Sequence, residues 1–229
     1  MTGLREIYEA EFEDRVFALQ PKSVLDVGCG EGQFLCRAAA RGISATGIDS
    51  NPERVARTRE NGLDTLHASA QSLPFADLRF DGAVCERSAH HFSDLAAGLA
   101  EAIRVARDLY VFDPWYDETI PSQKSAADLD RWMKRVDAAR GHVNNGPFSA
   151  QDILDALPRH IVSPDVSIVY RLNLMPVAVA DAAAEAERQL AGWDAATPYR
   201  HELETLLSGA RRTGLTGTGA LMVFIRRTQ

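Results

Sequence analysis

Short apolar runs alternate along the chain with segments in which apolar residues recur every three or four positions. The first kind of pattern is typical of buried strands and the second of amphipathic helices. The pattern predicts strands at residues 23–27, 45–48, 64–67, 81–85, 109–112, 166–172 and 221–226, and helices at 31–41, 52–60, 94–105 and 150–157, after an acidic amphipathic helix at the amino terminus. Strands that alternate with helices indicate an α/β fold, in which a doubly wound, mostly parallel sheet carries helices on both faces.

Two stretches fall outside this alternation. Residues 115–148 contain an amphipathic helix at about 123–140, followed by a turn-rich segment, and residues 177–212 contain two helices that break near Gly192 and Pro198. Insertions near the carboxyl edge of such a sheet are where substrates bind. With 229 residues, the chain is expected to form a single domain over 1–229, with these two insertions as lids.

A glycine-rich loop follows the first predicted strand. The sequence Val-Leu-Asp-Val-Gly-Cys-Gly-Glu-Gly places Gly28, Gly30 and Gly32 at alternate positions before a helix. Glycine is needed where the backbone takes positive φ or lies directly against a ligand, and a helix N-terminus presents free N–H groups. Asp49 ends the second predicted strand, where a carboxylate can accept both hydroxyls of a ribose. These features predict a nucleoside-containing cofactor.

The spacing of the loop identifies a family. Gly-x-Gly-x-Gly, with Asp26 two residues before the first glycine, resembles motif I of the class I S-adenosylmethionine-dependent methyltransferases, whereas dinucleotide sites use Gly-x-Gly-x-x-Gly. The resemblance implies a seven-stranded Rossmann-like sheet whose last strand is antiparallel, and S-adenosyl-L-methionine as cofactor. It places Asp26 toward the methionine end and Asp49 on the ribose. The expected cofactor-binding residues are Asp26, Gly28, Cys29, Gly30, Gly32, Asp49, Ser50, Ser69, Ala70 and Glu86.

The loop after the third strand departs from the family. Ala-Ser-Ala-Gln-Ser-Leu-Pro-Phe at 68–75 resembles the Gly-Asp-Ala-x-x-Leu-Pro-Phe loop, in which an aspartate accepts from the adenine amino group. Ser69 stands in place of that aspartate, and the loss of a charged hydrogen bond weakens binding by ~1–2 kcal/mol. The backbone N–H of Ala70 could still donate to the adenine ring, so we expect adenine at this loop.

Candidate catalytic residues come from the segment after the fourth strand and from the first insertion. The stretch 79–92 resembles the family's fourth strand and the loop beyond it, and paired histidines before an aromatic are common in its ubiquinone-biosynthesis-like small-molecule branch. Two adjacent histidines cannot both point the same way, so one is expected to support structure and the other to reach the pocket. Histidine suits general-base work at neutral pH because its ordinary pKa is ~6.5. The catalytic candidates are His90, His91, Glu86, His142 and Tyr116, with Asp113 as a further candidate base.

The expected reaction is in-line methyl transfer to a small-molecule acceptor, in secondary metabolism, with a general base only where the nucleophile must lose a proton. Two alternatives stay open. The α-amine of the cofactor could attack its own side chain and give a cyclic amino acid and methylthioadenosine. The chain could instead be a catalytically inert cofactor-binding subunit. The four residues at the place where nucleic-acid amino methyltransferases have Asn/Asp-Pro-Pro-Tyr/Phe are Cys85, Glu86, Arg87 and Ser88, which speaks against that substrate class.

Charge and cysteine content narrow the partners and the compartment. The net charge of −7 is unfavourable for phosphate backbones, so no nucleic acid is expected. No apolar run approaches the ~20 residues of a membrane span and the amino terminus does not read as a signal peptide, so we expect no membrane and a cytoplasmic protein. Three cysteines, an odd number, argue against a disulfide framework. No metal is expected, because no His-x-x-x-His or Cys-x-x-Cys spacing occurs, and a homodimer is left open.

Overall fold

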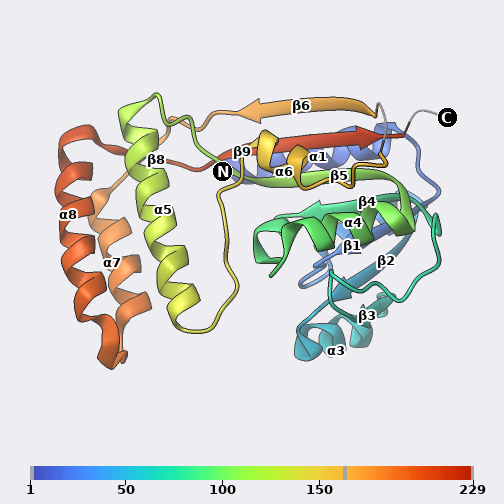
Figure 1. Cartoon of the computed structure of the whole chain (residues 1–229), viewed down its shortest axis with the longest axis horizontal. Helices are drawn as coiled ribbons and strands as arrows, with labels where there is room; N and C mark the ends of the chain where they lie inside the picture. Colours follow the sequence, from blue (N-terminus) through green and yellow to red (C-terminus); the bar gives the residue numbers. More distant parts are fainter. Residues whose placement is uncertain (1–2, 162–163, 228–229) are drawn as a thin grey trace. The chain divides into compact units, whose positions relative to one another are not determined.

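A computed structural model describes residues 3–161 and 164–227 (Figure 1). Its main sheet has seven strands in the order β3-β2-β1-β4-β5-β9-β6, and a two-stranded sheet pairs β7 with β8. The strands are β1 Ser23–Val27, β2 Ser44–Asp49, β3 Thr65–His67, β4 Phe80–Glu86, β5 Ala106–Trp115, β6 Asp165–Arg171, β7 Pro176–Val177, β8 Leu215–Thr216 and β9 Gly219–Arg226. The strand order of the main sheet moves outward from β1 to both sides, as in a doubly wound fold.

The helices alternate with these strands through the first half of the chain. They are α1 Leu4–Ala18, α2 Gln33–Ala40, α3 Pro52–Glu60, α4 Leu95–Val105, α5 Pro121–Ala139, α6 Ala150–Asp155, α7 Val179–Leu190 and α8 Thr197–Thr213, with short 3-10 turns at Ala89–His91 and Asp194–Ala196. Polar caps set several of the starts. Asn51 accepts from the N–H groups of Glu53 and Arg54 at the start of α3, and Asp94 accepts from Ala97 at the start of α4.

The predicted fold class is confirmed. Strands β1, β2, β3, β4 and β5 pair in parallel, with Val27 beside Ile48 and Asp26 beside Val84. In Figure 1 the arrow of β9 points opposite to that of β6, so the sheet is mostly but not wholly parallel. Its central strands are buried on both faces, as parallel sheets require. The carboxyl ends of β1, β2, β4 and β5 therefore meet at one edge of the sheet.

Most boundaries agree with the sequence to within one or two residues, and the differences have local causes. Strand β5 begins at Ala106, directly after Val105 ends α4, so the short connection becomes part of the strand. The pair β7–β8 is missing from the sequence prediction because strands of two residues have no periodicity. Of the three cysteines, Cys29 and Cys85 are buried and Cys36 is exposed on α2.

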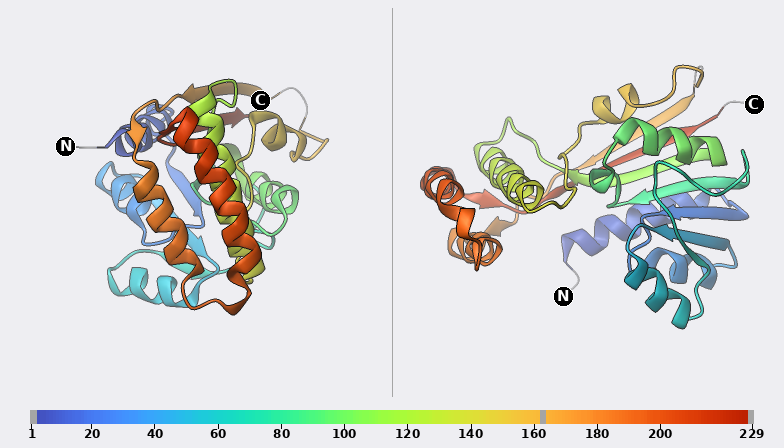
Figure 2. Two further views of the ribbon diagram at one scale, coloured as in Figure 1. Left: turned by 90° about the vertical axis from the view of Figure 1, so that its left-hand side faces the viewer. Right: turned by 60° about the horizontal axis from the view of Figure 1, so that its bottom comes forward.

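The chain divides into two compact units. The first consists of residues 1–113, 148–169 and 221–229, and the second of residues 114–147 and 170–220. The second unit contains α5, α7 and α8, which lie side by side in the left view of Figure 2. Its core contains Trp132, Leu190, Leu203 and other apolar side chains. The indole N–H of Trp132 donates a hydrogen bond to the carbonyl of Tyr199. The organisation as one domain with two lids stays a prediction.

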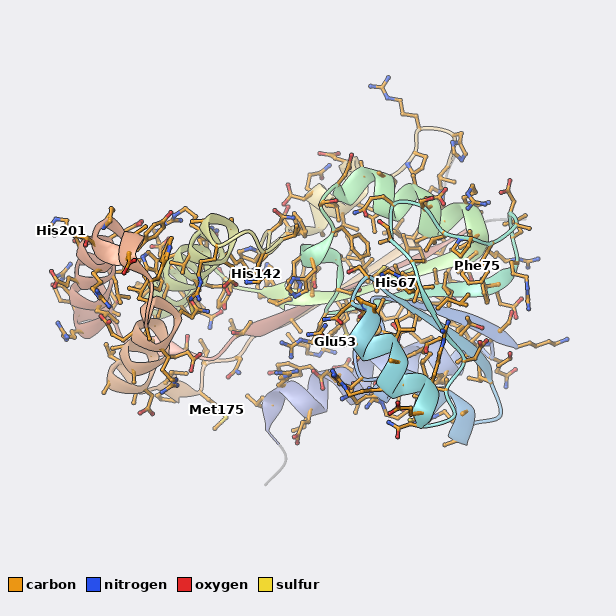
Figure 3. The ribbon with its side chains drawn as sticks, turned by 90° about the horizontal axis from the view of Figure 1, so that it is seen from below. Glu53, His67, Phe75, His142, Met175 and His201 are labelled. Carbon is orange, nitrogen blue, oxygen red and sulfur yellow. The ribbon has the colours of Figure 1, made fainter. Side chains whose placement is uncertain are left out.

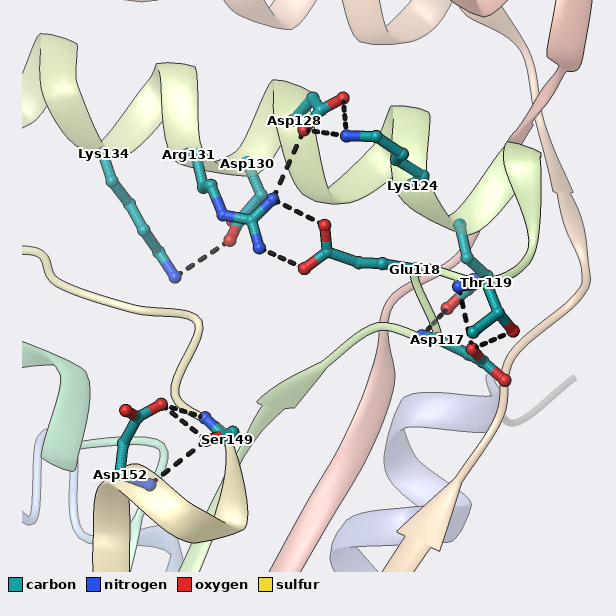
Figure 4. Close-up of polar contacts among 11 residues, drawn as sticks. Asp117, Glu118, Thr119, Lys124, Asp128, Asp130, Arg131, Lys134, Ser149 and Asp152 are labelled. Carbon is teal, nitrogen blue, oxygen red and sulfur yellow. Dashed lines mark hydrogen bonds and ion pairs between the residues drawn. The ribbon is translucent and has the colours of Figure 1, made fainter. Parts of the chain in front are cut away.

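Several partly exposed ion pairs lie on the surface of the second unit. Figure 4 shows Arg131 between the carboxylates of Glu118 and Asp128, and Lys124 paired with Asp128 at 2.9 Å.

In the first unit, helix α6 begins at a capping box in which Ser149 and Asp152 exchange hydrogen bonds. No helix in the described part of the chain combines the length and apolar character that crossing a bilayer requires.

Candidate cofactor and active site

The glycine loop turns sharply between β1 and α2. Gly28, Gly30 and Gly32 have φ of 83°, 53° and 78°, a region that residues with a Cβ rarely adopt. A Cβ on Gly28 would lie 2.6 Å from the Cβ of Ser88, whereas a Cβ on Gly30 would meet nothing within 4 Å. Glycine at position 28 is thus needed for packing as well as for φ, while Gly30 faces open space. The loop presents bare backbone on the side that a ligand could approach.

Asp49 holds the loop from the neighbouring strand. Its Oδ2 accepts from the N–H of Gly30 at 2.9 Å and its Oδ1 from the N–H of Asn51 at 2.8 Å. The side chain is buried. Each carboxylate oxygen has more than one lone pair, so both can accept a further hydroxyl. Asp49 therefore fixes the loop and keeps the acceptor capacity that a ribose needs.

Buried carboxyl groups gather at the ends of β1 and β4. Asp26 is only 2% exposed, and burial raises its pKa to about 7, an effect that Arg37 opposes and Asp49 reinforces. Burial also raises the pKa of Glu86 to about 8, with Asp26 and Glu13 adding to the rise. The Glu86 Oε2 atom is buried and has no hydrogen-bond partner among the described residues. Buried acids without a full complement of donors favour a cationic ligand at this place.

These acidic residues and the glycine loop fit S-adenosylmethionine. The cofactor carries an ammonium and a sulfonium, which the buried acids could neutralise, and a ribose diol, which Asp49 could accept. The open side of Gly30 leaves room for the backbone to approach it. The roles of Asp26, Gly28, Cys29, Gly30, Gly32, Asp49 and Glu86 in cofactor binding stay predictions on these grounds.

Sequence reasoning missed a charged link from α1 to this edge. Arg37 on α2 forms ion pairs with Glu13, which is buried on α1, and with Glu86, at 3.5 Å. Arg87, a non-glycine residue with φ of 55°, pairs with Glu9 at 3.1 Å. The signal in the sequence was faint: Glu9 and Glu13 lie one turn apart beside the apolar stripe of the first helix. Arg37 carried no signal at all.

The predicted adenine loop is only partly formed by the residues expected there. Ser69 is exposed and its hydroxyl hydrogen-bonds with Gln71, while Ala70 is buried. Ser50 is exposed, and its carbonyl lies 3.0 Å from the Nε2 of His67, which Figure 3 labels near β3. The adenine contacts of Ser69, Ala70 and Ser50 stay predictions.

The adjacent histidines after β4 differ in exposure, since His90 is buried and His91 is exposed. The Nδ1 of His90 lies 2.7 Å from the Oδ1 of Asp113, a residue of β5 that is 1% exposed. His91 is exposed, with its ring centroid 4.2 Å from that of His90. The carboxylate fixes the orientation of the His90 ring and leaves Nε2 as the nitrogen that Asp113 does not engage. The pairing with Asp113 needed the structure, because it joins the ends of two strands.

His142 and Tyr116 belong to the second unit, so their catalytic roles stay predictions. His142 is exposed in the turn after α5, and Figure 3 shows it on that unit. The Tyr116 hydroxyl lies 2.9 Å from Thr218 Oγ1, also within the second unit. Among residues 3–161 and 164–227, no group of three or more His, Cys, Asp and Glu side chains is placed to hold a metal ion.

Comparisons with known proteins agree with this geometry. Residues 25–109 match a family model described as a methyltransferase domain. An O-methyltransferase of Aspergillus nomiae is 30% identical over 129 residues, which cover 51% of this chain and 57% of that protein. A fatty-acid O-methyltransferase of Mycolicibacterium smegmatis is 36% identical over 152 residues, covering 61% and 54%. These matches show that residues 25–109 are similar to methyltransferase domains.

The likeness of the fold extends over nearly the whole chain. The crystal structure of the YcgJ protein from Bacillus subtilis superposes with a TM-score of 0.67, at 19% identity, over 96% of this chain and all of that one. At this identity the likeness concerns the fold. The chain spans a little over half the length of the curated relatives named above.

Proposed function

We propose that this protein transfers the methyl group of S-adenosylmethionine to a small-molecule acceptor. The observation that carries the proposal is the pair of acids formed by the buried Asp26 and the partly buried Glu86, beside a glycine loop that Asp49 contacts by a hydrogen bond. These carboxyl groups would repel the phosphates of an anionic nucleotide when they are ionised. A ligand with an ammonium and a sulfonium would instead be stabilised by them.

Each residue of the site then has a separate task. Asp49 accepts from the ribose hydroxyls while it holds the Gly30 N–H, and Gly30 lets the backbone lie against the ligand. Asp26 and Glu86 neutralise positive charge, and Ala70 donates its N–H to the adenine ring. When bound, S-adenosylmethionine supplies a methyl carbon on a positively charged sulfur, so the protein has mainly to align the acceptor and exclude water.

The pair His90 and Asp113 equips the site for acceptors that must lose a proton. Asp113 orients the His90 ring, and its negative charge stabilises the imidazolium that forms when Nε2 takes a proton. A hydroxyl acceptor would give its proton to His90 as its oxygen bonds to the methyl carbon and the carbon–sulfur bond breaks. The two relatives named above are called O-methyltransferases, and oxygen acceptors are the first class to test.

The test is to incubate the pure protein with S-adenosylmethionine, with and without a panel of hydroxyl and carboxyl acceptors, and to identify the products by mass spectrometry. The proposal expects S-adenosylhomocysteine and a methylated acceptor in equal amounts, only when an acceptor is present. Methylthioadenosine without an acceptor would replace the proposal with intramolecular cleavage. Cofactor binding without any turnover across the panel would favour an inert subunit, and no binding by calorimetry would reject the cofactor itself.

The variant His90→Ala separates chemistry from binding. Because His90 is paired with Asp113 and not with the acids beside the loop, the variant should lose turnover with a hydroxyl acceptor by roughly 10²–10⁴-fold. Its cofactor affinity should stay close to that of the wild type. His91→Ala is the matched control, since His91 is exposed beside it, and it should keep most of the activity.

A further inference from the structure

The outer strand of the sheet carries an exposed apolar face. Strand β6 ends the strand order and pairs with β9 alone within the described part of the chain, so it forms an outer edge of the main sheet (Figure 1). Ile168 is 38% exposed and Tyr170 is 44% exposed, and the two side chains share a face because they are two residues apart. Leu172, Leu174 and Met175 continue the run of exposed apolar residues along the chain, with Met175 labelled in Figure 3.

The strand lacks the features that usually protect an edge. Edge strands avoid pairing with other chains through proline, bulges, short length or charged residues in mid-strand. Strand β6 has seven residues, and its five central residues, Val166 to Tyr170, are all uncharged. Its only charges are Asp165, which lies 3.8 Å from Arg226 of the neighbouring β9, and Arg171, at the two ends. An unprotected strand of this length is suited to pairing with another strand.

The sequence of β6 is complementary to itself when it runs antiparallel. A two-fold axis perpendicular to the sheet, midway between the two copies of Ile168, sets Ile168 opposite its own copy and Val166 opposite Tyr170 of the second copy. The same axis sets Asp165 opposite Arg171 of the second copy at both ends. Apolar pairs and opposite charges directly across antiparallel strands each contribute roughly 0.2–1 kcal/mol.

Neighbouring registers lose this match. An axis perpendicular to the sheet allows only shifts that keep each face on its own side. Moving the axis by one residue sets Asp165 opposite Val169 or Asn173, and in neither case opposite an arginine. Only the register centred on Ile168 places apolar residues opposite each other and, at the same time, Asp165 opposite Arg171.

We infer that β6 is a homodimer interface, in which two copies of the chain join their sheets edge to edge in the register centred on Ile168. The second copy is the occupant that the charge pattern favours, because the same seven residues supply both halves of each pair. The interface is isologous, as two-fold symmetry demands. It is independent of the proposed methyl transfer and uses none of the residues placed at the glycine loop.

The first experiment measures the mass of the full chain by light scattering and sedimentation over a range of micromolar concentrations. The wild type should be a dimer. Ile168→Lys sets two lysines opposite each other on the axis and should raise the dimer dissociation constant by roughly tenfold or more. Leu78→Lys, at an exposed leucine elsewhere, is the matched control and should remain dimeric. A monomeric wild type, or a dimer that Ile168→Lys leaves unchanged, would overturn the inference.

A charge swap tests the register. Asp165→Arg sets two arginines opposite each other across the axis, and Arg171→Asp sets two aspartates together, so each single variant should weaken the dimer. The double variant restores opposite charges and should recover the wild-type dissociation constant, an interaction that a double-mutant cycle isolates. Additive weakening in the double variant would reject this register.

Cross-linking decides the matter even if a charged variant fails to fold. In a Cys36→Ser background, which removes the exposed cysteine, Ile168→Cys should form a disulfide between two copies. Directly opposite residues lie within the separation that a disulfide needs. Ser167→Cys should not cross-link, because Ser167 faces Val169 of the second copy. Equal cross-linking at both positions, or at neither, would contradict the register.

Discussion

Two groups of charged side chains, one in each unit of the chain, differ in how far they are exposed to water. In the first unit, Asp26 and Glu86 lie at the carboxyl edge of the sheet. Their pKa values are raised because burial penalises the charged form. In the second unit, the charges of α5, such as Arg131 and Lys124, form ion pairs that remain partly exposed (Figure 4). Solvent-exposed ion pairs stabilise a fold by ~0–1 kcal/mol. The difference indicates which charges are held for a ligand and which serve the surface.

The largest effect should come from Asp26 and the pH dependence of folding. Its carboxyl has a pKa of about 7 when folded, against an ordinary value of 3.8. The unfolded chain therefore loses this proton first, and the free energy of unfolding should fall as pH rises from about 4 to about 7, by on the order of a few kcal/mol. Denaturant unfolding at several pH values measures this slope. Asp26→Asn should flatten it, and a slope unchanged in that variant would assign it to other groups.

Replacing Asp49 by alanine should have the next largest effect. The substitution removes the acceptor expected for the ribose and leaves the Gly30 N–H without its partner. Cofactor affinity, measured by calorimetry, should fall by roughly tenfold or more, which is ~1.4 kcal/mol. The matched control is Asp128→Ala on α5, the same substitution of aspartate by alanine in the second unit. It should leave the cofactor affinity unchanged. Equal affinity in Asp49→Ala and the wild type would remove the ribose assignment.

The affinity for the cofactor should itself depend on pH. Below about pH 7 the unliganded site holds protons on Asp26 and Glu86, and a cationic ligand must displace them. Affinity should therefore rise with pH between 6 and 8, by up to about tenfold per unit. Glu86→Gln imitates the protonated carboxyl, so its loss of affinity should be small at pH 6 and grow above the Glu86 pKa of about 8. A profile that is flat in the wild type would contradict the charge argument.

The smallest effect is expected on the surface of the second unit. Arg131→Ala removes its contacts with Glu118 and Asp128, all three of them partly exposed. The free energy of unfolding should change by no more than about 1 kcal/mol, and cofactor affinity should not change. Chemical denaturation of the variant beside the wild type measures this. A loss as large as that of a buried group would show that the two units do not differ in the way described above.

Much of the site was predictable because its signals are local. The alternate glycines, the acidic residue two positions before them and Asp49 at the end of the next strand lie within 24 residues of one another, from 26 to 49. The glycines are explained by the backbone conformation of the loop, and the two acidic residues by their positions near the ends of strands. Both explanations can be made from the sequence. Arg37, Glu13 and the partner of His90 could not be predicted, since their contacts join elements that are distant in the chain.

The sequence alone determined the alternation of strands and helices, the cofactor loop and the resemblance to a methyltransferase, because periodicity and glycine spacing act over a few residues. Only the tertiary structure decided that Asp113 orients His90, that His91 is the exposed member of the pair, and that Glu86 keeps a buried oxygen without a donor. It also decided that β6 is an outer strand. These properties depend on which strand ends become neighbours and how much water reaches them, and both are set by packing across the whole sheet.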